Sequence, residues 1–452
     1  PVDYVDDYNT AWADMLKAGV TKAGNITVAG KGEADDEPVV ASIPDFKVYL
    51  KNNKGEDTDK YLEYHVVSFD NKTKSGTVEL KYVGYNKDGG TLTIPETVTT
   101  KVLNKEWTFT VVGIGENALF SYEMPGASSN YWFTTVNFPS TLEYIAKGGC
   151  WSLDKVTEID LSNTKVERIG SMAFYGCKKA EVIKLPATLE SMGGTVTGSK
   201  KKITAIPGKG DTVGDTGDVK IDVKDDSETY TDNIFACCDA LKEIIVDPAN
   251  PNFKDVDGIL YSKDGKKLIR YPNARPDTHF DIPEGVEIIA SQAFMQSYTG
   301  NSPLETVTFP SSLKEIESLA FRQSSLTSVT LPGILEKLGS SAFDIIKKLA
   351  SLTIEEGVKE LGDYAFWSCE ALTSVKFPAS LKKVGDSCFG HSGLTSVELG
   401  SVEEIGDYAF YYTNLKEVTI PATVKDAGIA SFCNIKTLTK ATFKAGAKDL
   451  GN

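Results

Sequence analysis

A six-residue motif, Ile/Leu-Gly-x-x-Ala-Phe, returns along this chain at a nearly constant interval. Clear copies are found at Ile169–Phe174, Leu338–Phe343, Leu361–Phe366 and Ile405–Phe410. A constant step of this size is the signature of a solenoid, in which each unit is one coil that stacks on the next. Successive units start 21 to 23 residues apart, at Phe309, Leu331, Ile354, Phe377, Leu399 and Ile420.

Each unit also contains a short segment with strand-like alternation. In the copy that ends the first unit, Val329 and Leu331 point to one face, and Ser328 and Thr330 point to the other. This alternation predicts a half-buried strand. The following Pro332 cannot donate to a ladder and ends the strand. We therefore expect one strand per coil, and a parallel sheet that runs along the array.

The remaining columns of the repeat predict the turn and the core. We expect the glycine of each Ile-Gly pair to permit a tight bend or a positive φ. The Ala-Phe pair should then place one small side chain and one ring in every layer. The phenylalanines expected to form a stacked internal spine are residues 174, 235, 294, 321, 343, 366, 389, 410 and 432.

Other parts of the chain depart from the repeat. Residues 61–69, 76–85 and 107–112 are expected to be strands, with a turn at Asp88-Gly89, and together they predict a β-rich N-terminal cap. Within residues 1–55, the segment Tyr8–Leu16 suggests one short amphipathic helix. Two excursions interrupt the repeat, at about 193–232 and 247–278. The second contains Asp264-Gly265, which is a strong hairpin signal.

Taken together, the columns Leu-x-x-Ile-Gly-x-x-Ala-Phe-x-x-Cys-x-x-Leu-x-x-Val-x-Leu-Pro resemble the BspA-like class of leucine-rich repeats over roughly residues 60–443. The resemblance implies an α/β-type repeat solenoid: a right-handed leucine-rich-repeat array with a parallel sheet and little regular helix. We divide the chain into a segment of uncertain fold (1–55), the β-rich cap (56–112), the array (113–443) and a tail (444–452).

The resemblance also implies a role. Proteins of this class are usually exported, occur mostly on the surface of host-associated bacteria, and are linked to adhesion to host proteins or to other cells. The class has no shared catalytic site, so no catalytic residue carries over to this sequence. We therefore expect a non-enzymatic, extracellular or cell-surface protein that binds proteins, with no cofactor. The chain begins with Pro1, so the absence of a signal peptide does not argue against export.

Composition narrows the partners further. The chain has 452 residues with 48 Lys and Arg against 63 Asp and Glu, a net charge of −15. That charge argues against binding to nucleic acid or an anionic membrane, both of which need a basic face. No apolar stretch approaches the roughly 20 residues of a transmembrane helix.

Several local motifs suggest chemistry, but the repeat explains them better. Gly113-Ile-Gly115-Glu-Asn-Ala118 matches a dinucleotide fingerprint, yet it coincides with the bend column of the repeat and lacks the acidic residue expected further on. Asp277-x-His279-x-Asp281 would place three polar groups on one strand face, either as a divalent-ion site or as a solvated edge. The acidic stretch 211–228 is either a calcium site or a solubilising loop.

The cysteines and histidines give no catalytic or metal pattern. No Cys-x-x-Cys spacing occurs, and His65, His279 and His391 are far apart in the sequence. Five cysteines lie on repeat columns that should be buried, which favours structural thiols over disulfides. These five are Cys150, Cys177, Cys238, Cys369 and Cys388, whereas Cys237 and Cys433 are off-column.

Two surfaces remain as candidate binding sites. The outward strand column is small and polar and should form a flat face that suits an extended protein. A second candidate is a set of aromatic residues beside the Ala-Phe column, which would suit protein or sugar contacts if they are exposed rather than buried between coils. The candidates on the sheet face are Ser328, Thr330, Thr353, Lys376, Glu398 and Thr419, and the aromatic candidates are Tyr364, Trp367, Tyr408 and Tyr411, with Tyr412 beside them.

Overall fold

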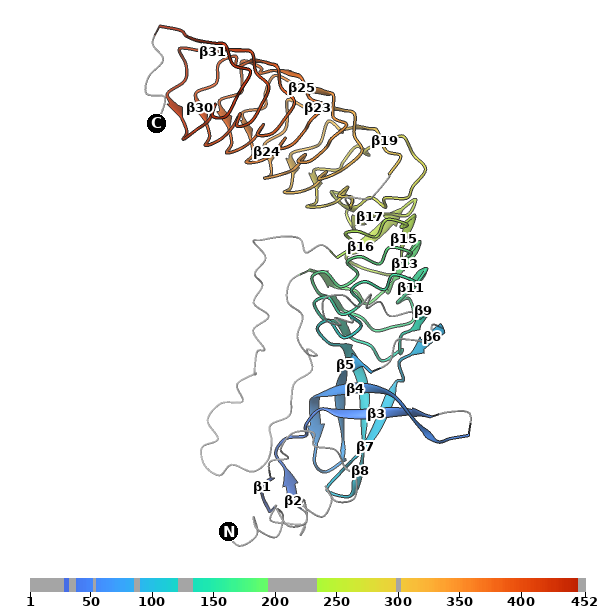
Figure 1. The fold of residues 1–452 in the computed structure, drawn as a ribbon. Coiled ribbons are helices and arrows are strands. Elements are labelled where there is room, and N and C mark those ends of the chain that lie inside the picture. Colours follow the sequence, from blue (N-terminus) through green and yellow to red (C-terminus); the bar gives the residue numbers. More distant parts are fainter. Residues whose placement is uncertain are drawn as a thin grey trace, which may run out of the picture.

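The structure is a computed structural model, and it describes residues 28–31, 38–51, 54–84, 90–120, 133–193, 234–297 and 302–445. Stacked coils form an elongated array with a sheet module at its N-terminal end, and the array changes direction near β16–β18 (Figure 1). The segment Tyr8–Leu16, the Asp88-Gly89 turn and the acidic stretch 211–228 lie outside the described residues.

The N-terminal module is a mostly antiparallel sheet. Strands β3 (Phe46–Lys51), β4 (Asp57–Asp70) and β5 (Ser75–Val83) pair in sequence, and β5 then pairs in parallel with β8 (Lys105–Ile114). These ranges confirm the strands predicted at 61–69, 76–85 and 107–112. Strand β7 (Thr97–Val102) pairs with β8 on the same sheet, while β1 (Val28–Lys31) and β2 (Pro38–Val40) form a separate antiparallel pair.

The coils carry two columns of parallel strands, whereas the sequence predicted only one. The predicted column holds strands of three to five residues. It comprises β6 (Gly90–Thr93), β9 (Phe133–Asn137), β11 (Glu158–Asp160), β13 (Val182–Leu185), β15 (Glu243–Val246), β19 (His279–Asp281), β21 (Thr306–Thr308), β23 (Ser328–Leu331), β25 (Ser351–Ile354), β27 (Ser374–Lys376), β29 (Ser396–Glu398), β31 (Glu417–Ile420) and β33 (Lys440–Phe443).

The second column was missed because each of its strands is only two residues long. It starts at the end of β8, so the sheet of the N-terminal module continues directly into the first coils. Its strands are β10 (Tyr144–Ile145), β12 (Arg168–Ile169), β14 (Ser191–Met192), β20 (Ile288–Ile289), β22 (Glu315–Ile316), β24 (Lys337–Leu338), β26 (Glu360–Leu361), β28 (Lys383–Val384), β30 (Glu404–Ile405) and β32 (Asp426–Ala427).

The third side of each coil is a turn whose backbone also forms hydrogen bonds to the next coil. Tyr364 and Ser368 both have a φ of 55°, in the left-handed region, and their N–H groups donate to the next coil. The N–H of Phe366 donates to the Cys388 carbonyl at 2.8 Å in the same ladder. Two left-handed residues so close together cannot continue an α-helix. The described residues accordingly contain no helix, and none that could cross a membrane.

The glycine of the repeated Ile-Gly pair allows close packing. The positive φ that was one of the two alternatives expected for it is found at Gly193, with a φ of 103°, but not at Gly362, Gly385 or Gly406. A Cβ added at Gly385 would lie 2.6 Å from the Asp363 nitrogen, and one at Gly406 would lie 2.6 Å from the Asp386 nitrogen. The left-handed conformation belongs instead to the residue two positions later, such as Ser387 with a φ of 51°. Only glycine lets the backbones of adjacent coils approach this closely.

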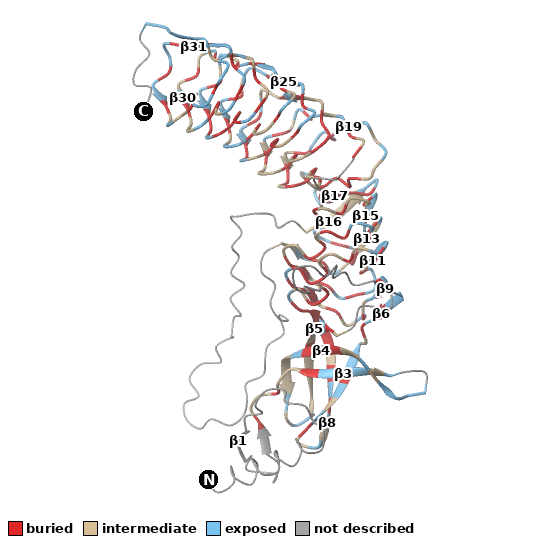
Figure 2. Ribbon diagram, in the orientation of Figure 1, coloured by how far each residue is buried: buried red, intermediate tan, exposed pale blue. Residues whose placement is uncertain are grey.

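The predicted phenylalanine spine is confirmed. Seven rings stack from Phe294 to Phe432 with centroids 4.5 to 5.7 Å apart and interplanar angles of 11° or less. Phe174 and Phe235 stack at 6.0 Å nearer the N-terminus. Buried residues accordingly follow the inside of the coils along the array (Figure 2). The five on-column cysteines are buried, and all seven cysteines are free, as the sequence favoured.

A β-hairpin is built into the array at the point where its direction changes. Strands β16 (Phe253–Val256), β17 (Ile259–Ser262) and β18 (Lys267–Arg270) are antiparallel, which confirms the hairpin predicted at Asp264-Gly265. Strand β18 also pairs in parallel with β20, so the hairpin takes the place of a coil in the second strand column. Tyr271 extends the ring stack, because its ring lies 5.0 Å from that of Phe294.

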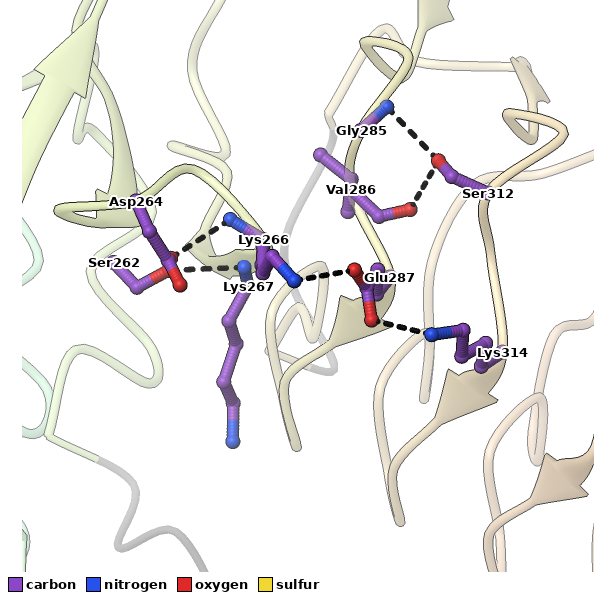
Figure 3. Close-up of polar contacts among 9 residues, drawn as sticks. All are labelled: Ser262, Asp264, Lys266, Lys267, Gly285, Val286, Glu287, Ser312 and Lys314. Atoms are coloured by element: carbon purple, nitrogen blue, oxygen red, sulfur yellow. Dashed lines mark hydrogen bonds and ion pairs between the residues drawn. The ribbon is translucent and has the colours of Figure 1, made fainter.

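Charged side chains join the hairpin to the coils that follow. The carboxylate of Glu287 contacts Lys266 Nζ of the hairpin at 2.8 Å and Lys314 Nζ of the next coil at 2.7 Å (Figure 3). The Lys266 and Lys314 contacts hold the pKa of Glu287 below its ordinary value. Beside them, Ser312 accepts from the Gly285 N–H and donates to the Val286 carbonyl.

Candidate binding surfaces

The outward side chains of the longer strand column form one exposed face. Along β23, Val329 and Leu331 are buried, whereas Thr330 between them is exposed. Pairing is in register from coil to coil, so equivalent positions form straight rows. Of the residues predicted for this face, Ser328 is half-buried, and Thr330, Thr353, Lys376, Glu398 and Thr419 are exposed.

This face is polar and nearly balanced in charge. Lys376 lies 3.2 Å from Glu398 in the adjacent strand, and Lys440 lies 3.7 Å from Glu417. All four side chains are more than two-thirds exposed, so these pairs are weakly held and can exchange for contacts with a partner. The arrangement suits hydrogen bonding to an extended chain rather than capture of a small molecule.

The three polar side chains of Asp277-x-His279-x-Asp281 do not come together on one strand face. His279 Nδ1 lies 2.7 Å from Thr306 Oγ1, and His279 Nε2 lies 3.0 Å from Asp281 Oδ1. Asp277 Oδ2 instead accepts hydrogen bonds from Arg275 Nε and from the Tyr271 hydroxyl. No group of three or more metal-ligating side chains occurs among the described residues.

The four aromatic candidates come together in one cluster that spans three coils. Trp367 contacts Tyr364 in its own coil, with ring centroids 5.7 Å apart, and His391 in the next coil at 4.5 Å. His391 in turn contacts Tyr411 at 5.5 Å. Tyr408 lies 5.7 Å from Tyr411 and completes the set. The rings thus form a continuous surface rather than isolated side chains.

The repeat explains how far each ring is exposed. Ala365 and Phe366 fill the core, so the residues on either side of them face outward. Tyr364 and Tyr408, which precede the Ala-Phe pair, are each 44% exposed, whereas Trp367 and Tyr411, which follow it, are half-buried. Gly390 makes room for the cluster, because a Cβ there would lie 2.3 Å from Cζ3 of Trp367. The indole can therefore lie across the middle coil and reach His391.

His391 is the part of the cluster that the sequence did not single out, whereas its neighbour Tyr412 was named beside the four aromatic candidates. Their rings stack at 4.9 Å with an interplanar angle of 5°. Both stand two residues after a spine phenylalanine, and this shared column was the signal that could have grouped them. Lys436 Nζ lies 5.9 Å from the Tyr412 ring and places a cation at the edge of the cluster.

A row of aspartates borders the aromatic cluster. Asp363 Oδ1 accepts from the Asp386 N–H, and Asp386 Oδ1 accepts from the Asp407 N–H, each at 2.8 Å. Asp407 Oδ1 continues the row by accepting from the Ile429 N–H at 2.6 Å. These carboxylates are therefore fixed to the backbone of successive coils, and they give the margin of the cluster a negative charge.

The dinucleotide-like motif is structural. Gly113 lies under the ring of Tyr144, whose hydroxyl donates to Glu79 Oε2 at 2.6 Å. Gly115 packs against the Leu80 carbonyl, 2.9 Å from where its Cβ would lie. Both glycines are thus explained by close packing at the junction between the module and the first coil.

The sequence matches the model of a known repeat family. The profile of the BspA type leucine rich repeat region is found in six copies, over residues 127–211, 273–395 and 346–452. Together these ranges cover more than half of the chain. None of the functionally curated proteins compared with the chain matches it.

Solved bacterial structures give weaker, global similarities. A leucine-rich repeat protein from Eubacterium ventriosum is 16% identical with a TM-score of 0.49, over 90% of this chain and 95% of that one. The pneumococcal vaccine antigen PcpA is 19% identical with a TM-score of 0.37, over 75% and 94%. A leucine rich cell surface protein from Faecalibacterium prausnitzii is 17% identical with a TM-score of 0.36, over 86% and 96%.

Proposed function

Since the chain belongs to the BspA-type leucine-rich-repeat family, we propose that it is a non-enzymatic protein of the bacterial cell surface that binds other proteins through its repeat array. The observation that carries this proposal is the exposed strand face from β23 to β33. On this face every coil offers outward side chains in straight rows. A long, regular and polar face of this kind matches an extended partner better than a small substrate.

Three structural details belong to the same proposal. We take the coils to be right-handed, because a strand that returns to a parallel neighbour almost always does so with that hand. We take the sheet module to be a cap, because its strand β8 supplies the edge on which β10 pairs. We also keep the boundary between module and array near residue 113.

The proposal is tested by making the exposed strand face strongly acidic. Thr330→Glu, Thr353→Glu and Lys376→Glu, made together, change the net charge by −4 and should abolish binding to a panel of immobilised extracellular-matrix proteins. The matched control, Lys348→Glu with Lys359→Glu, also changes the charge by −4 but lies off the face, and it should bind as the unaltered chain does. Equal binding by the triple variant would show that this face is not the interface.

The aromatic cluster supports a second candidate function, capture of a carbohydrate. Exposed rings bordered by carboxylates combine stacking surfaces with hydrogen-bond acceptors, which sugar ligands use. A glycan array should then give a signal that Trp367→Ala weakens. A signal that persists unchanged in that variant, or an array without any signal, would remove this candidate.

The non-enzymatic and surface parts of the proposal have separate tests. The three histidines stand in the module, in β19 and in a late coil, which does not favour a shared catalytic centre. A single acidic or histidine substitution that abolished a measured turnover would overturn the non-enzymatic part.

Protease shaving of intact cells should release this chain if it is displayed on their surface, and its retention in the cytosol would contradict display.

A further inference from the structure

A cavity of about 280 Å³ lies where the hairpin meets the coils before and after it. One part of its wall is apolar and comes from Met192, Ile234, Phe253 and Ile269. The other part is polar and includes Arg270 and Gln292. The volume is near the lower end of the range for small-molecule sites, which begins at about 300 Å³.

Arg270 is the most unusual group in this wall. The residue is 2% exposed, its Nη1 donates to the Gln292 carbonyl at 2.7 Å, and its Nη2 donates to the Met295 carbonyl at 3.3 Å. Its Nε has no hydrogen-bond partner, and within the described residues the guanidinium forms no ion pair. Burial lowers the pKa of Arg270, since two neutral carbonyls do not replace a counter-ion.

One carboxylate influences Arg270 without pairing with it. The charge of Asp239 favours the protonated form of Arg270, but the two side chains form no ion pair: Asp239 Oδ2 accepts from the Ser297 hydroxyl at 2.8 Å, and Asp239 Oδ1 is buried without a hydrogen-bond partner. An arginine buried without a carboxylate partner is costly, and such charges are normally paired. A ligand that carries one negative charge into the cavity would supply the missing partner.

The other charged residue of the wall has the same sign. Lys267 lines the cavity, and its side chain points away from the Lys266–Glu287–Lys314 row (Figure 3). Its Nζ lies 2.6 Å from Glu317, so its charge is already matched. Among the described residues, the cavity wall thus holds two cations and no carboxylate, in a chain whose net charge is −15.

We propose that this cavity binds a small organic monocarboxylate with an apolar body. The carboxylate lies toward Arg270, and the body packs against Met192, Ile234, Phe253 and Ile269. A monoanion fits because one cation of the wall is unpaired, and an apolar body fits because that side of the wall offers no hydrogen-bonding side chain. This site is separate from the strand face and does not depend on the proposed function.

The test is calorimetric titration of the full chain at pH 7 with benzoate and with hexanoate. Saturable binding of at least one acid is expected. Its neutral amide, benzamide or hexanamide, should bind about tenfold or more weakly, because it lacks the charge that Arg270 requires. Absence of saturable binding by both acids, or equal binding of acid and amide, would overturn the proposal. Tighter binding of inorganic phosphate would overturn the monocarboxylate class.

Three variants separate the site from general effects. Arg270→Met removes the charge, and Met192→Trp fills the cavity while leaving Arg270 in place, so both should abolish binding. If Arg270→Met fails to fold, as judged by circular dichroism, the Met192→Trp variant alone decides whether the ligand binds in this cavity. Arg275→Gln removes a nearby cation that pairs with Asp257 and Asp277 outside the cavity, and it should bind normally. Full binding by Met192→Trp would show that the ligand lies elsewhere.

Discussion

At the scale of single residues, the motif glycine sets how closely neighbouring coils approach. A Cβ on Gly385 would lie 2.6 Å from both the nitrogen and Oδ1 of Asp363. We predict that Gly385→Ala and Gly385→Asn each lower the free energy of unfolding by about 1–3 kcal/mol, because both overpack the contact. Equilibrium denaturation measures this. Ser374→Ala, on the exposed face, should stay within about 0.5 kcal/mol. If only Ala were harmful, a left-handed φ would be the reason for the glycine, because Asn tolerates that conformation.

A buried carboxylate should make the stability of the array depend on pH. Burial raises the pKa of Asp344 to about 7, although Arg322, with Nη1 at 3.1 Å from Oδ2, opposes the shift. The folded chain therefore keeps a proton that the unfolded chain releases near pH 4, so this group makes stability fall as pH rises from about 4 to 7.

Asp344→Asn should remove this dependence. We expect the variant to be more stable than the unaltered chain at pH 8 and to show no such gain at pH 4, as measured by urea midpoints at both values. A variant that is less stable at pH 8 would show that Arg322 holds the carboxylate ionised in the folded state.

At the scale of elements, each ring of the spine supports two coils. Phe366 is fully buried between Phe343 and Phe389, with centroids 5.5 and 5.4 Å away. We predict that Phe366→Ala costs about 3–5 kcal/mol in chemical denaturation, because the neighbouring coils cannot close the space that it leaves. Phe443→Ala is the control, since that ring is 54% exposed, and it should cost far less. Similar losses in both variants would mean that the stacked rings carry little of the stability.

Strands long enough to show an alternating pattern could be predicted from the sequence, whereas strands of two residues could not. The alternation at Ser328–Leu331 and the regular phenylalanine spacing predicted the longer strands and the spine. The second strand column was missed because pairs such as Lys383–Val384 are too short to show a period. The exposed candidates followed from the repeat columns, but the joining of Trp367 to His391 depends on space above Gly390, which only coordinates reveal.

At the scale of the whole molecule, the buried apolar side chains of the described residues form two large clusters instead of one. The first runs from the N-terminal module through the early coils, and the second runs from the hairpin to the last coil. Their boundary passes through strand β17, where Leu260 belongs to the first cluster and its neighbours Ile259 and Tyr261 belong to the second. Strand β18 is divided in the same way, because Leu268 belongs to the second cluster and Ile269 packs against the first, so the hairpin joins the two cores.

This division predicts that the two parts of the array lose their structure separately. In stacked coils, interactions reach only to neighbours, so damage should not spread past a weak junction. Phe366→Ala should therefore lower hydrogen-exchange protection, measured by mass spectrometry, in peptides from 302–445, and leave peptides from 133–193 unchanged. Phe174→Ala should do the reverse, since its ring stacks on Phe235 in the first cluster. If either substitution exposed both regions together, the hairpin would be a rigid coupling that makes the array one cooperative unit.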